Sequence, residues 1–289
     1  MLHFIINPAA GRTGCEKLYG RIEPILRARN IEPIVTVCKS VGGITPLAQS
    51  AVDSGAAGVV VMGGDGTVVE AARALANTGI PLGIIPGGTG NDLATTLGIP
   101  REPEKALEAV LQGKTRAMDA GSLNGLLFVN VAGTGFDVLV TKNVSKFKRV
   151  LTGLAGYGAA VFYSILKSKP KHVVLETQDG IIERDILLVA IANGRYYGGG
   201  MKVAPDADPF DGLFDICIID AVPRWKIPTL LSKFVKGKHL ALDICEYFKT
   251  PWINLRCEEE TTFNLDGEIA GEAPAKITLL PGALQVYVP

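Results

Sequence analysis

Residues 57–67 read AGVVVMGGDGT, an apolar run that ends in a glycine-rich turn and leads into a helix-period segment at 67–77. The run is short, rich in β-branched residues and bounded by glycine, which indicates a buried strand. A strand, a glycine turn and a helix in succession form the repeating unit of a parallel sheet covered by helices.

The same alternation extends through the first part of the chain. It predicts a doubly wound parallel sheet, in which ligands bind beyond the carboxyl ends of the strands. The further expected strands are 2–6, 33–38 and 82–85, and the further expected helices are 14–29, 44–54 and 102–112.

After about residue 117 the pattern changes to short β-rich runs broken by turn residues, with helical stretches within 135–167 and 223–236. We therefore predict an α/β fold in which a nucleotide-type parallel domain (1–118) precedes a β-rich, largely antiparallel domain (119–283), with a cleft shared by the two. A last strand, 284–289, is expected to return to the first domain. The expected strands of the second domain are 126–131, 172–177, 185–192, 213–219, 252–257, 261–265, 276–280 and 284–288.

Composition excludes several classes of protein. The 289 residues carry 29 basic and 29 acidic side chains, so the positive excess typical of nucleic-acid-binding proteins is missing. Five cysteines without a CxxC pair and three histidines without HExxH argue against a disulfide framework and a zinc site. The first residues lack the basic and apolar regions of a signal peptide. These features predict a cytoplasmic protein.

Two stretches of the second half contain basic residues and no acidic ones. They lie between Asp137 and Glu176 and between Asp220 and Asp243, and aromatic and aliphatic residues are interleaved with the lysines and arginines. Such segments suit the surface of an anionic membrane, although two solvated helix faces would look the same. We expect peripheral attachment through 142–149 and 224–238, and a packed rather than membrane-spanning helix at the uncharged run 150–166.

Three glycine-rich turns follow strands of the first domain. They are Asn7 to Arg12 (NPAAGR), Gly63 to Thr67 (GGDGT) and Gly87 to Asp92 (GGTGND). Glycines allow backbone N–H groups to face an anion, and a helix that starts just after adds the positive end of its dipole. Thr67 and Asn91 or Asp92 are residue types that cap helix N-termini. The turns therefore predict a polyphosphate-binding site.

An aspartate inside such a turn would repel phosphate unless Mg²⁺ lies between them or the carboxylate accepts a proton. Asp65 and Asp92 occupy this position in the second and third turns. Aspartate and glycine are also common in ordinary turns, but two such turns in strand–turn–helix context favour the functional interpretation. No P-loop, dinucleotide fingerprint or GxSxG elbow is present.

With these motifs the chain resembles the catalytic domain of the diacylglycerol kinase family, and more narrowly its soluble bacterial lipid kinases. The likeness rests on NPAAGR, GGDGT and GGTGND, and continues in the second half with PDADPFDGL at 205–213 and FNLDGE at 263–268. GGDGT alone is shared with NAD kinases and 6-phosphofructokinases. The combination with GTGND and LDGE is much more specific.

The resemblance implies ATP and Mg²⁺ as cofactors and assigns a role to each matching residue. ATP is expected at Asn7, Gly11, Gly63, Gly64, Asp65, Gly66, Thr67, Gly88, Thr89 and Asn91. Catalytic Mg²⁺ is expected at Asp65, Asp92 and Asp119, and a second, structural metal ion at Asp208, Asp211 and the backbone carbonyl of Leu213. Glu268 matches the proton acceptor, with Asp266 as its close competitor.

The residues themselves support these second-domain roles less strongly. Asp266 and Glu268 are alternate residues of a segment that we expect to be extended, so both side chains are expected on one side of a strand. Carboxylates near a turn are often simply solvated, and an Asp/Pro/Gly loop explains 205–213 equally well. Cys38 stands where these kinases often carry a threonine near the nucleotide, and no role is evident for Gly198 to Gly200.

We therefore expect an ATP- and Mg²⁺-dependent lipid kinase of phospholipid metabolism that phosphorylates diacylglycerol at the membrane surface. Kinases for a sphingoid base, phosphatidylglycerol, a polyprenol or NAD remain open, as does a non-catalytic nucleotide- or lipid-binding regulator. No nucleic-acid partner is expected, and a homodimer is an open alternative for the assembly.

Overall fold

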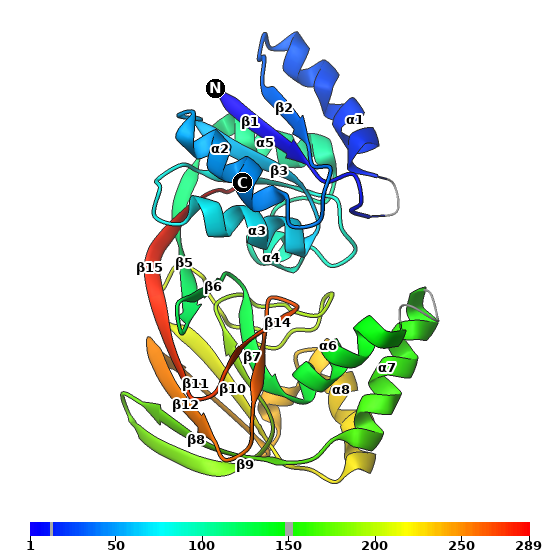
Figure 1. Ribbon diagram of the computed structural model, residues 1–289, viewed down its shortest axis with the longest axis vertical. Coiled ribbons are helices and arrows are strands. Elements are labelled where there is room, and N and C mark those ends of the chain that lie inside the picture. Colours follow the sequence, from blue (N-terminus) through cyan, green and yellow to red (C-terminus); the bar gives the residue numbers. More distant parts are fainter. Residues whose placement is uncertain (12–13, 148–152) are drawn as a thin grey trace. The chain divides into compact units, whose positions relative to one another are not determined.

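The computed structural model describes residues 1–11, 14–147 and 153–289 of the chain (Figure 1). The chain divides into two compact units. Unit 1 contains Met1–Ala120, Gly198–Gly200 and Leu280–Pro289, and unit 2 contains Gly121–Tyr197 and Met201–Leu279. The sequence-based boundary is 118/119, whereas the first division of the structure follows Ala120.

Unit 1 is built on a parallel sheet with the strand order β2-β1-β3-β4-β15. Every residue of β3 and β4 is buried, as expected for central strands covered on both faces. The final strand pairs with β4 through Val286 and Leu82, so distant parts of the chain complete one sheet. The strands are β1 (Leu2–Ile6), β2 (Ile34–Val37), β3 (Gly58–Gly63), β4 (Leu82–Pro86) and β15 (Ala275–Tyr287).

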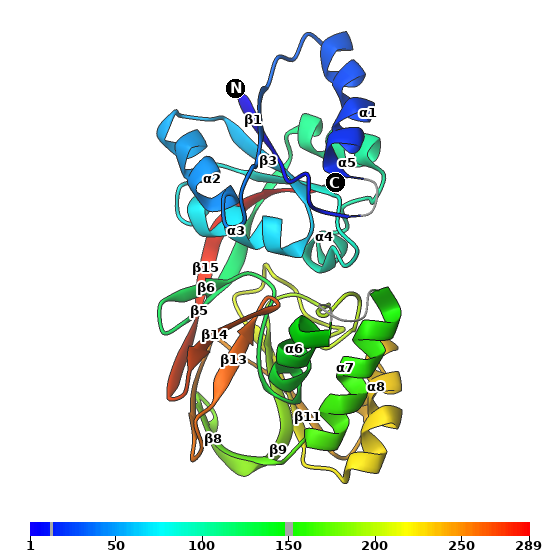
Figure 2. The ribbon, with the colours of Figure 1, turned by 45° about the vertical axis from the view of Figure 1, so that its right-hand side comes forward.

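The helices of unit 1 cover both faces of this sheet. Helix α1 packs with α5 on one face and α2 packs with α3 on the other, as Figure 2 shows. The predicted doubly wound arrangement is therefore confirmed. The helices are α1 (Cys15–Ala28), α2 (Ile44–Asp53), α3 (Asp65–Leu75), α4 (Asp92–Thr96) and α5 (Pro103–Gln112).

Unit 2 is β-rich and its strand pairs are antiparallel, as predicted. The long strand β9 pairs with β7, β8 and β10. Strand β5 begins in unit 1 and enters unit 2, where it pairs with β6. The strands are β5 (Thr115–Leu123), β6 (Leu126–Phe128), β7 (Val131–Gly135), β8 (Lys171–Thr177), β9 (Gly180–Ala192), β10 (Phe214–Asp220), β11 (Cys245–Thr250), β12 (Trp252–Cys257), β13 (Thr262–Leu265) and β14 (Glu268–Glu272).

Strand β10 separates two hydrophobic cores of unit 2. Ile216 and Ile218 belong to a core formed among strands, whereas the alternate residues Cys217 and Ile219 belong to a core shared with the helices. Because side chains of a strand alternate between faces, a strand that is apolar throughout must be covered on both sides. The helical layer therefore packs on the face of β7, β9 and β10 that carries Cys217.

This helical layer consists of α6 (Phe136–Phe147), α7 (Gly153–Lys167), the 3-10 helices η1 (Arg224–Lys226) and η2 (His239–Ala241), and α8 (Ile227–Val235). Helices α6 and α7 pack together (Figure 1). Ile165 of α7 packs on the core that contains Leu230 of α8. Within residues 1–11, 14–147 and 153–289, no helix has the length and apolar character needed to cross a membrane. The run 150–166 was expected to form a packed helix, and its first three residues lie outside the described residues.

Several elements were not predicted. Strands β5, β11 and β14 and the short helix α4 escaped the sequence analysis. The single strand expected at 126–131 is divided into β6 and the first residue of β7, and the two strands expected at 276–280 and 284–288 form the single strand β15. The five-residue helix α4 is too short to produce a helical period, and β11 mixes polar with apolar residues (CEYFKT).

Candidate active site

The three glycine-rich turns of unit 1 are packed against one another. The amide of Gly87 donates a 2.8 Å hydrogen bond to the carbonyl of Gly63, which joins the second turn to the third. A Cβ atom on Gly11 would lie 1.9 Å from the carbonyl oxygen of Gly87, and one on Gly88 would lie 2.5 Å from the Cα of Gly64. These glycines are thus required first for backbone-to-backbone contact between the turns.

Asn7 connects the first turn to helix α3. Its Nδ2 donates to Thr67 Oγ1 at 2.9 Å, while its Oδ1 accepts the amide of Ala9 at 3.1 Å. The residue type of Thr67 suggested a helix cap, but Thr67 is buried inside α3 and does not cap the helix. The capping position belongs to Gly64, because the helix begins two residues earlier than the sequence indicated.

Asn91 stabilises the third turn from within. Its Oδ1 accepts the amide of Gly88 at 2.9 Å and its Nδ2 donates to the carbonyl of the same residue at 2.8 Å. Its backbone has φ of 56°, a left-handed conformation that asparagine tolerates better than most residues. Asn91 occupies the N-cap position of α4, as expected, but makes no side-chain cap bond there.

Asp65 supplies the missing cap from the second turn. Its carboxylate accepts the amides of Asn91 at 3.0 Å and Asp92 at 2.6 Å, so both oxygens bind the start of α4. Charge-assisted hydrogen bonds to backbone amides are among the stronger ones in proteins. Asp65 therefore fixes the second turn to the third.

Asp92 is buried next to Asp65. Its Oδ2 accepts the amide of Gly199 at 2.9 Å, which gives the glycine run 198–200 a structural role that its sequence did not reveal. Burial raises the pKa of Asp92, and the neighbouring charge of Asp65 raises it further. A hard cation would relieve this repulsion, so the two carboxylates fit a hydrated Mg²⁺ that has few protein ligands.

The third predicted magnesium ligand, Asp119, lies in β5. Its carboxylate is buried, and Oδ1 accepts the amide of Gly282 at 2.8 Å. In the described part of the chain, no three His, Cys, Asp or Glu side chains form a group that could hold a metal ion. The structure therefore brings Asp65 and Asp92 together without forming a cage of protein carboxylates.

Backbone amides remain for a ligand at the start of α3. Among the described residues no side chain caps this helix at Gly64, and the first amides of an α-helix have no partner within the helix. Gly66 is exposed, and a Cβ atom there would meet no atom within 4 Å. Thr89 is also exposed. Cys38, in contrast, is buried, and its thiol donates to the carbonyl of Ser40 at 3.1 Å.

In unit 2, Asp266 lies in the tight turn of a hairpin and not in an extended strand. Asp266 and Gly267 both have positive φ, 52° and 96°, between the paired residues Leu265 and Glu268. The expectation that Asp266 and Glu268 alternate along one strand is therefore wrong. An Asp-Gly pair between two β runs is a signal for such a two-residue turn, and it could have been recognised in the sequence.

The carboxylate of Asp266 accepts three consecutive backbone amides. These belong to Val129 at 2.7 Å, Asn130 at 2.9 Å and Val131 at 2.9 Å. Asp266 therefore anchors the hairpin to the segment that precedes β7. Glu268, the first residue of β14, is exposed.

The residues expected at a second metal site form a compact turn. Oδ1 of Asp208 accepts the amide of Phe210 at 3.2 Å, and Oδ1 of Asp211 accepts the amide of Leu213 at 3.0 Å. The sequence analysis missed Lys249, whose Nζ lies 2.6 Å from Oδ2 of Asp211.

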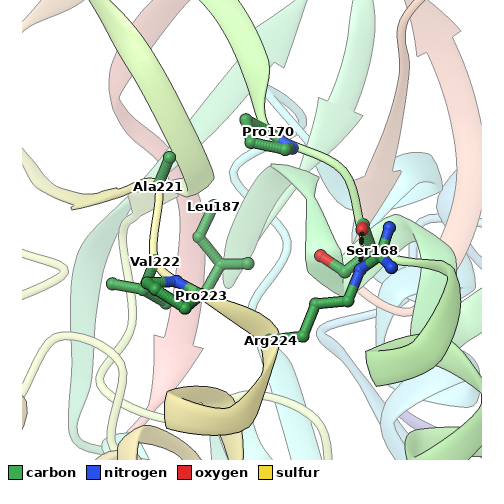
Figure 3. Close-up of a pocket in the computed structure, with 7 residues that line it drawn as sticks. All are labelled: Ser168, Pro170, Leu187, Ala221, Val222, Pro223 and Arg224. Carbon is green, nitrogen blue, oxygen red and sulfur yellow. Dashed lines mark hydrogen bonds between the residues drawn. The ribbon is translucent and has the colours of Figure 1, made fainter.

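A pocket of about 320 Å³ lies elsewhere in unit 2, and no predicted site residue lines it. Its walls are largely apolar, and Arg224 contributes a guanidinium whose Nε donates to the carbonyl of Ser168 at 2.8 Å (Figure 3). This bond joins the end of α7 to the start of η1. The lining residues are Ser168, Pro170, Leu187, Ala221, Val222, Pro223 and Arg224.

Comparisons with known proteins match both parts of the chain. Residues 1–123 match the family model of the diacylglycerol kinase catalytic domain, and residues 130–288 match that of the YegS C-terminal NAD kinase beta sandwich-like domain. A diacylglycerol kinase of Mycobacterium tuberculosis is 34% identical, with 99% of this chain and 94% of that protein covered. A diacylglycerol kinase of Bacillus subtilis is 31% identical, with 99% and 95% covered.

Solved structures agree with these matches. A crystal structure of a diacylglycerol kinase from Bacillus anthracis has a TM-score of 0.78 at 25% identity and covers 100% of this chain and 96% of that chain. A further structure from the same bacterium has a TM-score of 0.83 at 26% identity, with 100% and 97% covered.

Proposed function

Since the chain belongs to the diacylglycerol kinase family and is a lipid kinase, we propose that it transfers the γ-phosphoryl group of ATP to a lipid hydroxyl, with diacylglycerol as the first-choice acceptor. The two relatives named diacylglycerol kinase match this chain over nearly its full length. Relatives from Pseudomonas species are named YegS-like lipid kinases, so other lipid acceptors stay in the test below.

The observation that carries the nucleotide part of the proposal is the contact among the turns after β1, β3 and β4. Their polar side chains bind one another: Asn7 binds Thr67, Asp65 binds the start of α4, and Asn91 binds Gly88. The groups available to a ligand are therefore backbone N–H groups, chiefly those at the uncapped start of α3. These amides and the positive end of the helix dipole together favour phosphate. We assign the triphosphate to this place.

Mg²⁺ fits beside Asp65 and Asp92, whose two neighbouring carboxylates would hold it chiefly through its water ligands. When bound, it would neutralise charge on the phosphates and on the group being transferred. Asp65 and Asp92 would orient its water ligands, and Asp119 is a further candidate. The bonds from Asp65 to α4 and from Asp92 to Gly199 hold these carboxylates in place before any ligand binds.

Glu268 is the proposed proton acceptor for the lipid hydroxyl. The three amides that bind Asp266 occupy much of the lone-pair capacity of its carboxylate, which suits an anchor better than a base. Glu268 follows directly after the turn that Asp266 anchors, so Asp266 is assigned as a positioning residue.

The proposal is tested by transfer of radiolabelled phosphate from ATP to a panel of acceptors, with Mg²⁺ or with a chelator. The panel contains diacylglycerol, a sphingoid base, phosphatidylglycerol and a polyprenol in mixed micelles, and NAD in solution. We expect Mg²⁺-dependent labelling of a lipid, strongest for diacylglycerol. Labelling of NAD alone would contradict a lipid acceptor, and no turnover of any acceptor would indicate a non-catalytic binding protein.

Peripheral attachment to an anionic membrane is the proposed way in which the enzyme meets its substrate. Phe162 and Leu166 of α7 and Trp225 of η1 are 63%, 53% and 75% exposed. The bond between Arg224 and Ser168 joins these two elements, and Lys226 lies 5.3 Å from the ring of Trp225. We call Phe162, Leu166, Trp225 and the exposed Lys167, Lys169 and Lys226 the α7–η1 surface.

The predicted segment 224–238 contributes to this surface through Trp225 and Lys226. The other predicted segment is 142–149, of which residues 148 and 149 lie outside the described residues. At its start, the Lys142 ammonium donates a hydrogen bond to Thr262 Oγ1. Co-sedimentation with phosphatidylglycerol-containing vesicles at low and high salt tests the attachment. Binding that weakens with salt supports it, and no binding at low salt contradicts it.

A further inference from the structure

The second metal site implied by the family resemblance contains a lysine that the motif does not mention. Lys249 lies in β11, directly opposite Asp215 of β10 in an antiparallel pair. Its Nζ lies 2.6 Å from Oδ2 of Asp211 and 3.3 Å from Oδ2 of Asp215. One ammonium thus bridges a loop carboxylate and a strand carboxylate.

The position of Lys249 is fixed by the sheet. Strands β10 and β11 stay in register from Phe214 to Ile219, so the backbones of Asp215 and Lys249 face each other across regular hydrogen bonds. Opposite charges in directly facing positions stabilise a strand pair. Regular strand pairing, and not a surface loop, therefore places Lys249 next to Asp215.

The ammonium of Lys249 stabilises the buried carboxylate of Asp215. The Asp215 side chain is 1% exposed, and its Oδ1 accepts a 2.5 Å hydrogen bond from the hydroxyl of Tyr247. A buried carboxylate is stable as an ion only when it is paired and hydrogen-bonded, and Lys249 provides the pairing.

Asp211 has little capacity left for a metal ion. Its Oδ1 accepts the amide of Leu213, and its Oδ2 receives the Lys249 ammonium. A magnesium ion lies about 2.1 Å from a ligand oxygen. If it shared Oδ2 with Lys249, the two cations would be less than about 5 Å apart, where like charges repel strongly.

We propose that in this chain the ammonium of Lys249 takes the place of the second metal ion, so that the loop 205–213 is held to β10 and β11 by an internal ion pair. The residues Asp208, Asp211 and Leu213 do not fit a divalent ion while Lys249 is bonded to Asp211. Unit 2 then keeps its structure without a divalent cation, and any metal requirement of the enzyme is confined to the nucleotide.

Mn²⁺ binding to the full chain without nucleotide is the first test, measured from the electron paramagnetic resonance signal of free Mn²⁺. We expect the wild type and Asp211→Asn to bind the same number of Mn²⁺ ions with the same affinity. If the wild type binds one more equivalent than Asp211→Asn, the proposal is overturned.

Thermal unfolding is the second test and uses Lys249→Gln, with the exposed Lys276→Gln of the same unit as the matched control. The wild type and the control should unfold at the same temperature in chelator. Lys249→Gln should unfold about 5–15 °C lower in chelator and recover part of this loss in 10 mM Mg²⁺. A Lys249→Gln midpoint equal to that of the control would also overturn the proposal.

The two tests remain informative separately. If Lys249→Gln does not fold, the comparison of wild type with Asp211→Asn still decides the matter, because neither protein carries that substitution. A wild-type midpoint that falls in chelator, while that of Asp211→Asn does not respond, would show a metal ion at this loop and reject the replacement.

Discussion

At the scale of single residues, the motif side chains of unit 1 act first on the protein itself. Asp65, Asn7 and Asn91 each bond to a neighbouring turn or to their own turn. The sequence identifies these residues because the motif letters are distinctive, but it cannot show which atoms bind one another. That information depends on distances between turns that are far apart in the chain.

Asp65→Asn is predicted to lower the stability of the protein as well as its activity. The change removes a carboxylate that accepts two backbone amides, and hydrogen bonds to charged groups contribute about 1.5–3 kcal/mol each. We expect the free energy of unfolding to fall by about 2–4 kcal/mol in denaturant titration. The exposed Glu32→Gln serves as a control, and equal stability of the wild type and Asp65→Asn would refute the assigned contact.

Glu268→Gln and Asp266→Asn are predicted to separate catalysis from anchoring. Loss of a general base lowers kcat by roughly 10²–10⁴-fold, so Glu268→Gln should lose activity while ATP binding and the unfolding midpoint are retained. Asp266→Asn should unfold at a lower temperature because three backbone amides lose their charged acceptor. The roles are misassigned if Glu268→Gln turns over lipid at the wild-type rate.

At the scale of helices and strands, a buried carboxyl group at the start of α6 makes the free energy of unfolding depend on pH. Asp137 is buried, and its carboxylate accepts a 3.4 Å hydrogen bond from Asn264. Burial raises the pKa of Asp137 to about 7 from its ordinary value of 3.8. At a pH between these two pKa values, Asp137 is protonated in the folded protein and ionised in the unfolded chain.

The unfolding free energy is therefore predicted to decrease as pH rises through the window from about 4 to 7, and this contribution should level off above pH 7. Between pH 5 and pH 8 the loss should be about 2–3 kcal/mol, since one pKa unit corresponds to about 1.4 kcal/mol. Denaturant titration of Asp137→Asn should show a flatter profile and greater stability at pH 8. Parallel profiles for the two proteins would exclude Asp137 as the source.

The α7–η1 surface is predicted to carry the membrane affinity. Replacing Phe162 and Trp225 together by serine removes large exposed apolar groups and should weaken vesicle binding by at least about tenfold. Ile181→Ser is the matched control, because this residue is 70% exposed on the β8–β9 hairpin. Equal binding of the double variant and the control would place the membrane contact elsewhere.

The sequence predicts the elements with strong periodic signals and misses those without one. Buried strands such as β3 and β4 are uniformly apolar, and α1 has the spacing of a one-sided helix. Strand β11 escapes notice because its polar residues, including Lys249, are stabilised by partners on β10 that only the folded sheet brings opposite. Tertiary contacts override the local pattern there.

At the scale of the whole molecule, the proposed nucleotide site belongs to unit 1 alone. Hydrogen exchange with a non-hydrolysable ATP analogue and Mg²⁺ should therefore slow the amides at 63–67 and 87–92 most strongly. A ligand present at 100 times its Kd stabilises the state that it binds by about 2.7 kcal/mol. Protection confined to unit 2 would contradict the assignment of the triphosphate to the turns of unit 1.

The fold class follows from the sequence because the change from strand–helix alternation to β-rich runs is visible in the residues themselves. The division of the chain is harder to predict. Gly198–Gly200 and Leu280–Pro289 belong to unit 1 although unit 2 surrounds the former in the sequence and precedes the latter. Their placement depends on contacts such as that of Gly199 with Asp92, which no local pattern encodes.

The position of β15 has a consequence for biosynthesis. Leu284 and Val286 are fully buried in unit 1, and Val286 lies beside Leu82 of β4. A ribosome makes β4 long before it makes residues 280–289. The edge of β4 that pairs with β15 therefore stays unpaired while unit 2 is translated. Nascent unit 1 thus offers a binding edge to chaperones until its last strand leaves the exit tunnel.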